Sequence, residues 1–239
     1  MRRQEVPAIT LGTYYTRRGS ISRPNDSQMR HFVYVAKDDF SFNGVTIDHP
    51  RHPSGKAQFI STTPGAHEYF AETIAAHADR IRERLSIDLD YPVTLVPIPT
   101  SQTTRATLNA PRWPGRDLAY ALERHGFGKT MLALAFKNAR QSKHAGGPSL
   151  KAHELFEDFE VLEAPDEDDT IVLVDDVLTW GDHIAAADAC FVNGNVVALA
   201  VATTCNGMVD ACTPRHRLVS YVRAAKGPWD VSVSDREVT

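Results

Sequence analysis

The sequence predicts an α/β protein with a parallel sheet flanked by helices and a β-rich elaboration at the N-terminus. Three apolar runs predict the strands, at residues 93–98, 171–174 and 196–201. Their continuous apolar character is typical of strands buried on both faces, which is the mark of a parallel sheet. Helical patterns with one apolar face separate the runs, as βαβ units require. With 239 residues, the chain is long enough for one sizeable α/β domain and an elaboration beside it.

The N-terminal elaboration covers residues 1–62, which we expect to be mostly β and irregular. Residues 31–36 form a β-rich run. Apolar side chains then alternate with polar ones from Phe40 to Ile47 around Asn43-Gly44, a strong signal for a two-residue hairpin. This hairpin lies outside the repeat of strands and helices, so we treat it as an extension of the α/β domain.

Two amphipathic helices belong to the α/β domain, which we place at residues 63–222. The first begins at Thr63-Pro64, a cap residue followed by a proline in the first turn. Its buried face is predicted from residues at helical spacing: Phe70, Ile74, Ala78, Ile81 and Leu85. The second helix occupies residues 114–126 and ends at a glycine. Residues 218–222 are expected to form a last strand, and residues 223–239 a loose tail.

Two loops of this domain carry groups that suit phosphate. The first follows the strand at 93–98 and is rich in serine and threonine. Its Thr100 and Ser101 offer hydroxyl and backbone donors, and Arg105 can add positive charge. The second loop, residues 137–148, is basic and glycine-rich, and long loops of this kind often act as lids.

A short helix and an acidic segment follow the second loop. Ser149 is predicted to cap the helix, which covers residues 150–159. Residues 154–169 contain nine acidic residues and no basic one, a composition typical of a solvated surface.

The most informative stretch begins at the strand of residues 171–174, which ends in the adjacent carboxylates Asp175 and Asp176. Open α/β sheets bind ligands at the carboxyl ends of their strands. The turn at 179–182 then leads into a helix, and such a turn can bind an anion through free backbone N–H groups. Gly181 leaves this backbone approachable because it has no Cβ. The stretch therefore predicts a βαβ unit built around a phosphorylated ligand.

The segment at 174–183, VDDVLTWGDH, resembles the phosphoribosyl pyrophosphate (PRPP) motif of the type I phosphoribosyltransferases, in particular the competence-protein-F-like branch. The resemblance covers residues 91–205. It implies that Asp175 and Asp176 are catalytic residues that hold the ribose hydroxyls of PRPP. It also implies that the loop after them binds the 5′-phosphate through Thr179, Trp180, Gly181, Asp182 and His183.

The resemblance implies further site residues, a metal and a reaction. The loop with Thr100, Ser101 and Arg105 resembles the pyrophosphate loop of the family. Arg140 and Lys143, in the basic stretch, would close over pyrophosphate as catalytic residues. Mg²⁺ would arrive with PRPP, and the acidic pair would reach it indirectly through ligand and water. The implied enzyme transfers ribose 5-phosphate to a nitrogenous acceptor and releases pyrophosphate, with residues 1–62 either forming a hood that selects the acceptor or merely extending the sheet.

Three departures from the family pattern leave other functions open. Hydroxyl or small residues are usual where this chain has Trp180, Asp182 and His183. One alternative is a nucleotide sensor or partner subunit that keeps the fold and has lost the transfer activity. Another is a protein that binds a nucleoside or a sugar phosphate other than PRPP, with His183 contacting the altered group.

Composition and charge indicate which partners and which cellular compartment to expect. A net charge of −4 and a pI near 6.2 argue against a general nucleic-acid binder. No apolar run approaches the length of a membrane span, and no secretion signal is apparent. Cys190, Cys205 and Cys212 cannot all pair and lack zinc-ligand spacing, so we expect a reducing, cytoplasmic compartment. The family commonly dimerises, and both a homodimer and a complex with a partner protein remain open.

Overall fold

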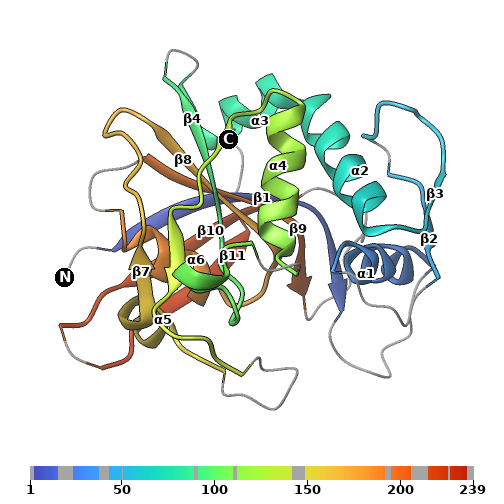
Figure 1. The fold of residues 1–239 in the computed structure, drawn as a ribbon. Helices are drawn as coiled ribbons and strands as arrows, with labels where there is room; N and C mark the ends of the chain where they lie inside the picture. Colours follow the sequence, from blue (N-terminus) through green and yellow to red (C-terminus); the bar gives the residue numbers. More distant parts are fainter. Residues whose placement is uncertain are drawn as a thin grey trace.

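The computed structural model describes residues 3–15, 24–37, 43–49, 51–88, 91–109, 112–141, 149–191, 195–205, 215–225 and 227–235. Within them, seven strands form the main sheet in the order β11-β10-β1-β9-β8-β4-β5 (Figure 1). The strands are β1 (Gln4–Tyr15), β4 (Val93–Pro97), β5 (Lys129–Thr130), β8 (Thr170–Leu178), β9 (Asn195–Cys205), β10 (Arg215–Val222) and β11 (Asp230–Asp235). The five strands from β1 to β5 in this order are parallel, β10 is antiparallel to β1, and β11 is antiparallel to β10.

Helices cover both faces of this sheet. One hydrophobic core contains residues of α1 (Pro24–Ala36), α2 (Thr63–Ala75), α3 (Ala78–Leu85) and α4 (Pro114–Arg124). The core on the other face contains residues of α5 (Ala152–Asp158) and α6 (Asp182–Asp188). The predicted α/β class, with a mostly parallel sheet flanked by helices, is confirmed. Within the part of the chain that the structure describes, no helix is long and apolar enough to cross a membrane.

Strand β8 shows why continuous apolar runs predicted this sheet. Val172 and Val174 lie in one core, and Ile171 and Leu173 lie in the other. All four side chains are at most 2% exposed. A strand with helices on both sides must be apolar at every position, since neither face meets water.

The predicted helices are confirmed, except that the first begins after a different cap residue and is divided in two. The cap of α2 is Thr62, whose hydroxyl accepts a hydrogen bond from the Gly65 N–H at 3.2 Å. The single helix expected from Thr63 to Leu85 is interrupted after α2, and α3 begins at Ala78. The second helix, α4, ends before Gly126, which adopts a left-handed φ of 75°.

The prediction of a β-rich run at residues 31–36 is wrong, because this segment belongs to helix α1. Met29, Phe32, Val33 and Ala36 recur at helical spacing and are at most 1% exposed. Burial of this apolar face against the sheet outweighs the strand preference of the β-branched residues in the run.

Two small sheets lie beside the main one. In the first, β2 (Val45–Ile47) pairs with β3 (Gln58–Ile60). Among the described residues, β2 is therefore paired with a strand that comes after it in the sequence. The hairpin arm expected before Asn43-Gly44 lies outside the described residues. In the second, β6 (Leu134–Phe136) pairs with β7 (Phe159–Val161), and a short 3₁₀ helix spans Arg105–Thr107.

Both ends of the described chain are built into the main sheet. Strand β1 lies between β9 and β10, so the boundary expected at residue 62 does not separate this strand from the α/β domain. The prediction of a loose tail after residue 222 is wrong, since β11 forms the edge of the sheet. Trp229 stacks on Tyr221 with ring centroids 5.5 Å apart and contacts Phe156. Alternating valines in β11 are the strand signal that the sequence does carry.

The contact between α6 and β10 includes a carboxyl group with a raised pKa. The Tyr221 hydroxyl donates a hydrogen bond to Asp188 Oδ2 at 2.7 Å. Burial raises the pKa of Asp188 to about 6, although the bond from Tyr221 acts in the opposite direction. The folded protein therefore keeps this proton at pH values where the unfolded chain has released it.

We predict that Asp188 makes the protein less stable as the pH rises from about 4 to about 6. In that range the unfolded state loses the proton first, so the free energy of unfolding falls, by on the order of 2–3 kcal/mol. Asp188→Asn keeps an acceptor for Tyr221 and removes the titration. Urea unfolding at pH 4 and pH 7 should show a smaller loss of stability for Asp188→Asn than for the wild type, and equal losses would contradict the prediction.

Candidate functional site

The acidic pair lies near the carboxyl edge of the sheet, at a level where β4 has ended and β8 continues. Strand β4 ends at Pro97, which is paired with Val174, whereas β8 continues to Leu178 beside β9. Asp175 and Asp176 therefore lie inside the strand rather than after it, which corrects the predicted end of the strand at residue 174. The correction has a simple cause: the ladder with β9 continues past the acids, and it ends only at Leu178. Both acids are half-buried.

Lys37, which sequence reasoning missed, completes a charged cluster with the acidic pair. Its Nζ lies 3.1 Å from Asp176 Oδ2. Asp175 Oδ1 accepts a hydrogen bond from the Asp176 N–H at 2.8 Å. Burial raises the pKa of Asp175 well above its usual range, and the neighbouring Asp176 raises it further. The pair thus combines a carboxylate that is ion-paired with Lys37 and a carboxyl group whose surroundings favour its protonated form.

His183 belongs to the same cluster. It is the second residue of α6, and its ring is accessible to water. Surrounding protein lowers the pKa of His183, the charges of Asp176 and Asp182 oppose this shift, and Lys37 adds to it. A neutral imidazole is therefore the expected form at pH 7, able to donate one hydrogen bond to a ligand and to accept another.

The predicted phosphate turn is tightly packed on one side and open on the other. Thr179 is exposed, and Trp180 is 66% exposed. Gly181 has a left-handed φ of 80° and precedes α6. A Cβ at Gly181 would lie 2.8 Å from Val219 Cγ1 and 3.0 Å from Val233 Cγ2. The glycine thus allows the turn to approach β10 and β11, a role that differs from the predicted approach to a ligand.

We predict that Gly181→Ala destabilises the protein by roughly 2 kcal/mol or more. The new methyl group meets branched side chains on the sheet, and the left-handed backbone disfavours any residue with a Cβ. Chemical denaturation measures the change. Gly227→Ala is the matched control, because its φ is 84° and nothing lies within 4 Å of the added Cβ. Equal effects of the two substitutions would show that the contact with β10 and β11 is unimportant.

Asp182 directs its side chain to a neighbouring helix. Its Oδ1 accepts a hydrogen bond from the Ala152 N–H at 3.0 Å, and its Oδ2 lies 3.8 Å from Lys151 Nζ. Asp182 thereby satisfies the N-terminus of α5, which begins at Ala152, so the prediction that Ser149 caps this helix is wrong. The Asp182 carboxylate is partly neutralised, and only its backbone is left for the turn.

The Ser/Thr-rich loop after β4 is joined to β8 at the level of the acidic pair. The Ile98 N–H donates to the Val174 carbonyl at 2.9 Å. The indole N–H of the buried Trp113 donates to the Ile98 carbonyl at 2.7 Å. Within the loop, the Thr100 N–H donates to Thr103 Oγ1 at 3.2 Å, and the two threonine hydroxyls are 2.9 Å apart. The loop therefore reaches the site already hydrogen-bonded to itself.

The predicted pyrophosphate-binding cations are paired with the acidic segment. Arg105 Nη2 lies 2.7 Å from Glu160 Oε1, and Arg140 forms an ion pair with Asp158. The Arg140 N–H also donates to the Ser101 carbonyl at 2.7 Å, which brings the two predicted loops side by side. Lys143 lies outside the described residues. Most acids of the acidic segment are exposed, as expected for a solvated surface, and two others pair with these arginines.

The described part of the chain contains no cluster of three or more His, Cys, Asp or Glu residues that could hold a metal ion. The oxygen atoms of the acidic pair suit an ion that is bound mainly through ligand oxygens and water. The chain matches no family model and no curated protein.

Proposed function

We propose that the protein binds Mg²⁺-PRPP at the carboxyl edge of β8 and transfers its ribose 5-phosphate to a nitrogenous acceptor. One observation carries the proposal: Asp175 and Asp176 extend beyond the end of β4 and lie next to Lys37. In parallel α/β sheets, ligands bind at this edge. The resemblance of residues 174–183 to the PRPP motif supplies the identity of the ligand.

The chemistry requires stabilisation of charge on both sides of the breaking bond. As the bond between the anomeric carbon and pyrophosphate breaks, positive charge develops on the ribose, and an ionised Asp176 would favour it. In its protonated form, which burial favours, Asp175 would donate a hydrogen bond to a ribose oxygen. The acceptor nitrogen then forms the new bond to the anomeric carbon and releases its proton.

Other described groups would bind the phosphorylated ends of PRPP. Backbone N–H groups of Thr179 to Asp182 would contact the 5′-phosphate, and His183 can add a hydrogen bond. Asp175 and Asp176 would hold Mg²⁺ through ligand and water, and the ion would neutralise charge on pyrophosphate. Arg140 would have to exchange Asp158 for pyrophosphate to take part.

The ion pairs of Arg105 and Arg140 favour a second candidate function. A protein whose pyrophosphate-binding arginines remain paired with Glu160 and Asp158 would bind a nucleotide without catalysing transfer. Such a protein would act as a nucleotide sensor or as a partner subunit.

An assay of pyrophosphate release separates the two functions. The purified protein is incubated with Mg²⁺-PRPP and a panel of purine, pyrimidine and other nitrogenous acceptors. Transfer predicts acceptor-dependent release that Asp175→Asn/Asp176→Asn abolishes. A sensor binds Mg²⁺-PRPP or a nucleotide, and that binding is lost in the same variant, but it releases no pyrophosphate with any acceptor. A protein that neither binds nor turns over these ligands would overturn both functions.

A further inference from the structure

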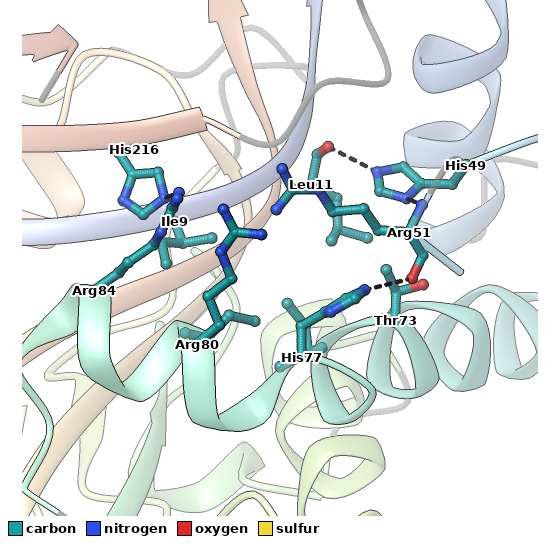
Figure 2. A pocket seen from close by; sticks show the side chains of 11 residues that line it. Ile9, Leu11, His49, Arg51, Thr73, His77, Arg80, Arg84 and His216 are labelled. Atoms are coloured by element: carbon teal, nitrogen blue, oxygen red, sulfur yellow. Dashed lines mark hydrogen bonds between the residues drawn. The ribbon is translucent and has the colours of Figure 1, made fainter. Parts of the chain in front are cut away.

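A second candidate site is a pocket between helices α2 and α3 and strand β1 (Figure 2). We call it the basic pocket after its arginine and histidine residues, which are His49, Arg51, His77, Arg80, Arg84 and His216. Its floor is apolar and includes Ile9 and Leu11 of β1. The pocket is partly open to solvent. None of the described residues that line it is acidic.

The positive charges of the basic pocket face one another. Figure 2 shows the guanidinium groups of Arg51 and Arg80 directed toward the same space. Burial lowers the pKa of Arg51, and the charges of Arg80 and Arg84 lower it further. Arg84, which also lines the pocket, donates a hydrogen bond to Nε2 of His216. Like charges held close together are unfavourable until an anion lies between them.

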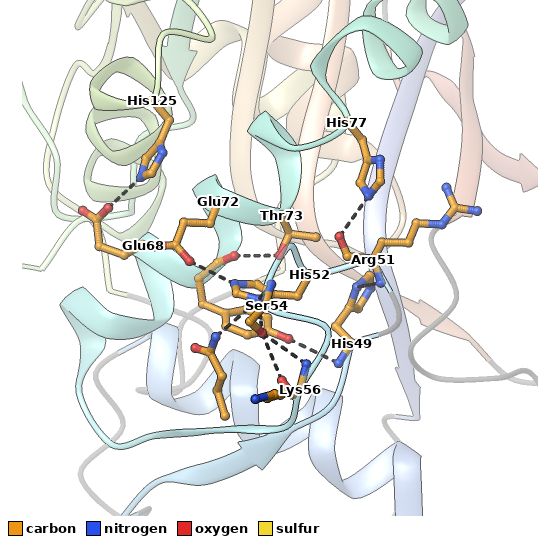
Figure 3. A network of polar contacts seen from close by, with 12 residues as sticks. His49, Arg51, His52, Ser54, Lys56, Glu68, Glu72, Thr73, His77 and His125 are labelled. Carbon is orange, nitrogen blue, oxygen red and sulfur yellow. Dashed lines mark hydrogen bonds and ion pairs between the residues drawn. The ribbon is translucent and has the colours of Figure 1, made fainter.

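The backbone of Arg51 is held in place by two histidines. The Arg51 N–H donates to His49 Nδ1 at 3.2 Å, and His77 Nε2 donates to the Arg51 carbonyl at 2.9 Å. His49 Nε2 in turn donates to the Leu11 carbonyl at 3.1 Å, so His49 is neutral with its tautomer fixed. Figure 3 shows the Arg51 side chain extending away from this network.

The rest of the 49–56 segment is anchored to α2. The His49 N–H donates to the Tyr69 hydroxyl at 3.2 Å. His52 stacks on the Tyr69 ring with centroids 4.0 Å apart, and its Nε2 lies 3.0 Å from Glu72 Oε2 (Figure 3). The segment that carries Arg51 is therefore preorganised, which lowers the entropic cost of binding a ligand.

We propose that the basic pocket binds a small ligand through a phosphoryl group. Arginine pairs with phosphate oxygens in bidentate geometry, and the two guanidinium groups of Arg51 and Arg80 match a dianion better than the single charge of a carboxylate. The apolar floor suits an organic group attached to the phosphate. This inference does not rest on the proposed function, because the basic pocket and the acidic pair lie on different strands. Ile9, in the floor of the pocket, is two strands from Val174, which precedes the acidic pair; this is roughly 10 Å at the usual spacing between strands.

Calorimetric titration with inorganic phosphate and with phenyl phosphate, at constant ionic strength, tests the proposal. The proteins are the wild type, Arg80→Gln, Arg51→Gln and Lys129→Gln. Arg80 is exposed on α3, and its loss relieves repulsion, so the fold should be kept. Lys129 is the control, because it is exposed on β5, at the opposite edge of the sheet. The Asp175→Asn/Asp176→Asn variant serves as a second control.

We expect saturable phosphate binding whose Kd rises tenfold or more in Arg80→Gln and in Arg51→Gln. Lys129→Gln and the double acid variant should bind like the wild type. Tighter binding of phenyl phosphate would identify a phosphate ester as the natural ligand, and equal binding would identify free phosphate. Absence of saturable binding by the wild type, or equal losses in Arg80→Gln and Lys129→Gln, would overturn the proposal.

Discussion

Asp176→Asn is expected to reduce phosphoribosyl transfer by about 100-fold or more, the scale of losing one charge-stabilising group in an active site. The substitution removes the negative charge that would favour the cationic ribose. It also removes the carboxylate that lies 3.1 Å from Lys37 and so changes the balance of charge at the site. Pyrophosphate release at saturating acceptor measures the loss.

Asp175→Asn should have a smaller effect, about tenfold, because asparagine resembles the protonated carboxyl group that burial favours at this position. The matched control is Asp168→Asn, an exposed position just before β8 and at the opposite end of that strand. It should leave the rate unchanged. Equal losses for Asp175→Asn and Asp176→Asn would contradict the different charge states that we assign to the two acids.

Trp113→Ala is expected to lower the free energy of unfolding by about 3–5 kcal/mol, the cost usual for removing a large buried aromatic side chain. Trp113 is fully buried, directly precedes α4, and donates a hydrogen bond to the Ile98 carbonyl. Because Ile98 also bonds to Val174, the substitution should loosen the loop beside the acidic pair. Urea unfolding measures the loss of stability.

Trp180→Ala is the matched control, since that indole is 66% exposed, and it should change stability by less than about 0.5 kcal/mol. Trp113→Phe keeps most of the volume and removes only the hydrogen bond, so a loss of about 1–3 kcal/mol is expected. A cost below about 1 kcal/mol for Trp113→Ala would mean that the core relaxes around the missing ring.

The sheet was predictable because its central strands need apolar residues at every position. Val172 and Leu173 face opposite cores, and that requirement is visible in four consecutive residues. Helix α1 was missed although Met29, Phe32, Val33 and Ala36 recur at helical spacing, because the β-branched residues of the run favour a strand. Strand β11 was missed although Val231 and Val233 alternate with polar residues as strand residues do.

The candidate site was predictable only where neighbouring residues form it. Asp175 and Gly181 lie close together in the sequence, so the sequence indicates this part of the site directly. Lys37 reaches Asp176 from a distant segment, and no spacing rule connects the two. Likewise, the use of Asp182 as a cap for α5 depends on how two helices meet in space. The same holds for the basic pocket, whose arginines and histidines come from segments that only the fold brings together.

Calorimetric titration of Mg²⁺-PRPP into the purified protein is the decisive test of the site at the acidic pair. We expect micromolar binding by the wild type and loss of that binding in Asp175→Asn/Asp176→Asn. Retention of binding by the Lys129→Gln control would show that overall charge is not responsible. A folded wild-type protein that fails to bind Mg²⁺-PRPP, or a double variant that binds it equally well, would contradict the assignment of this site.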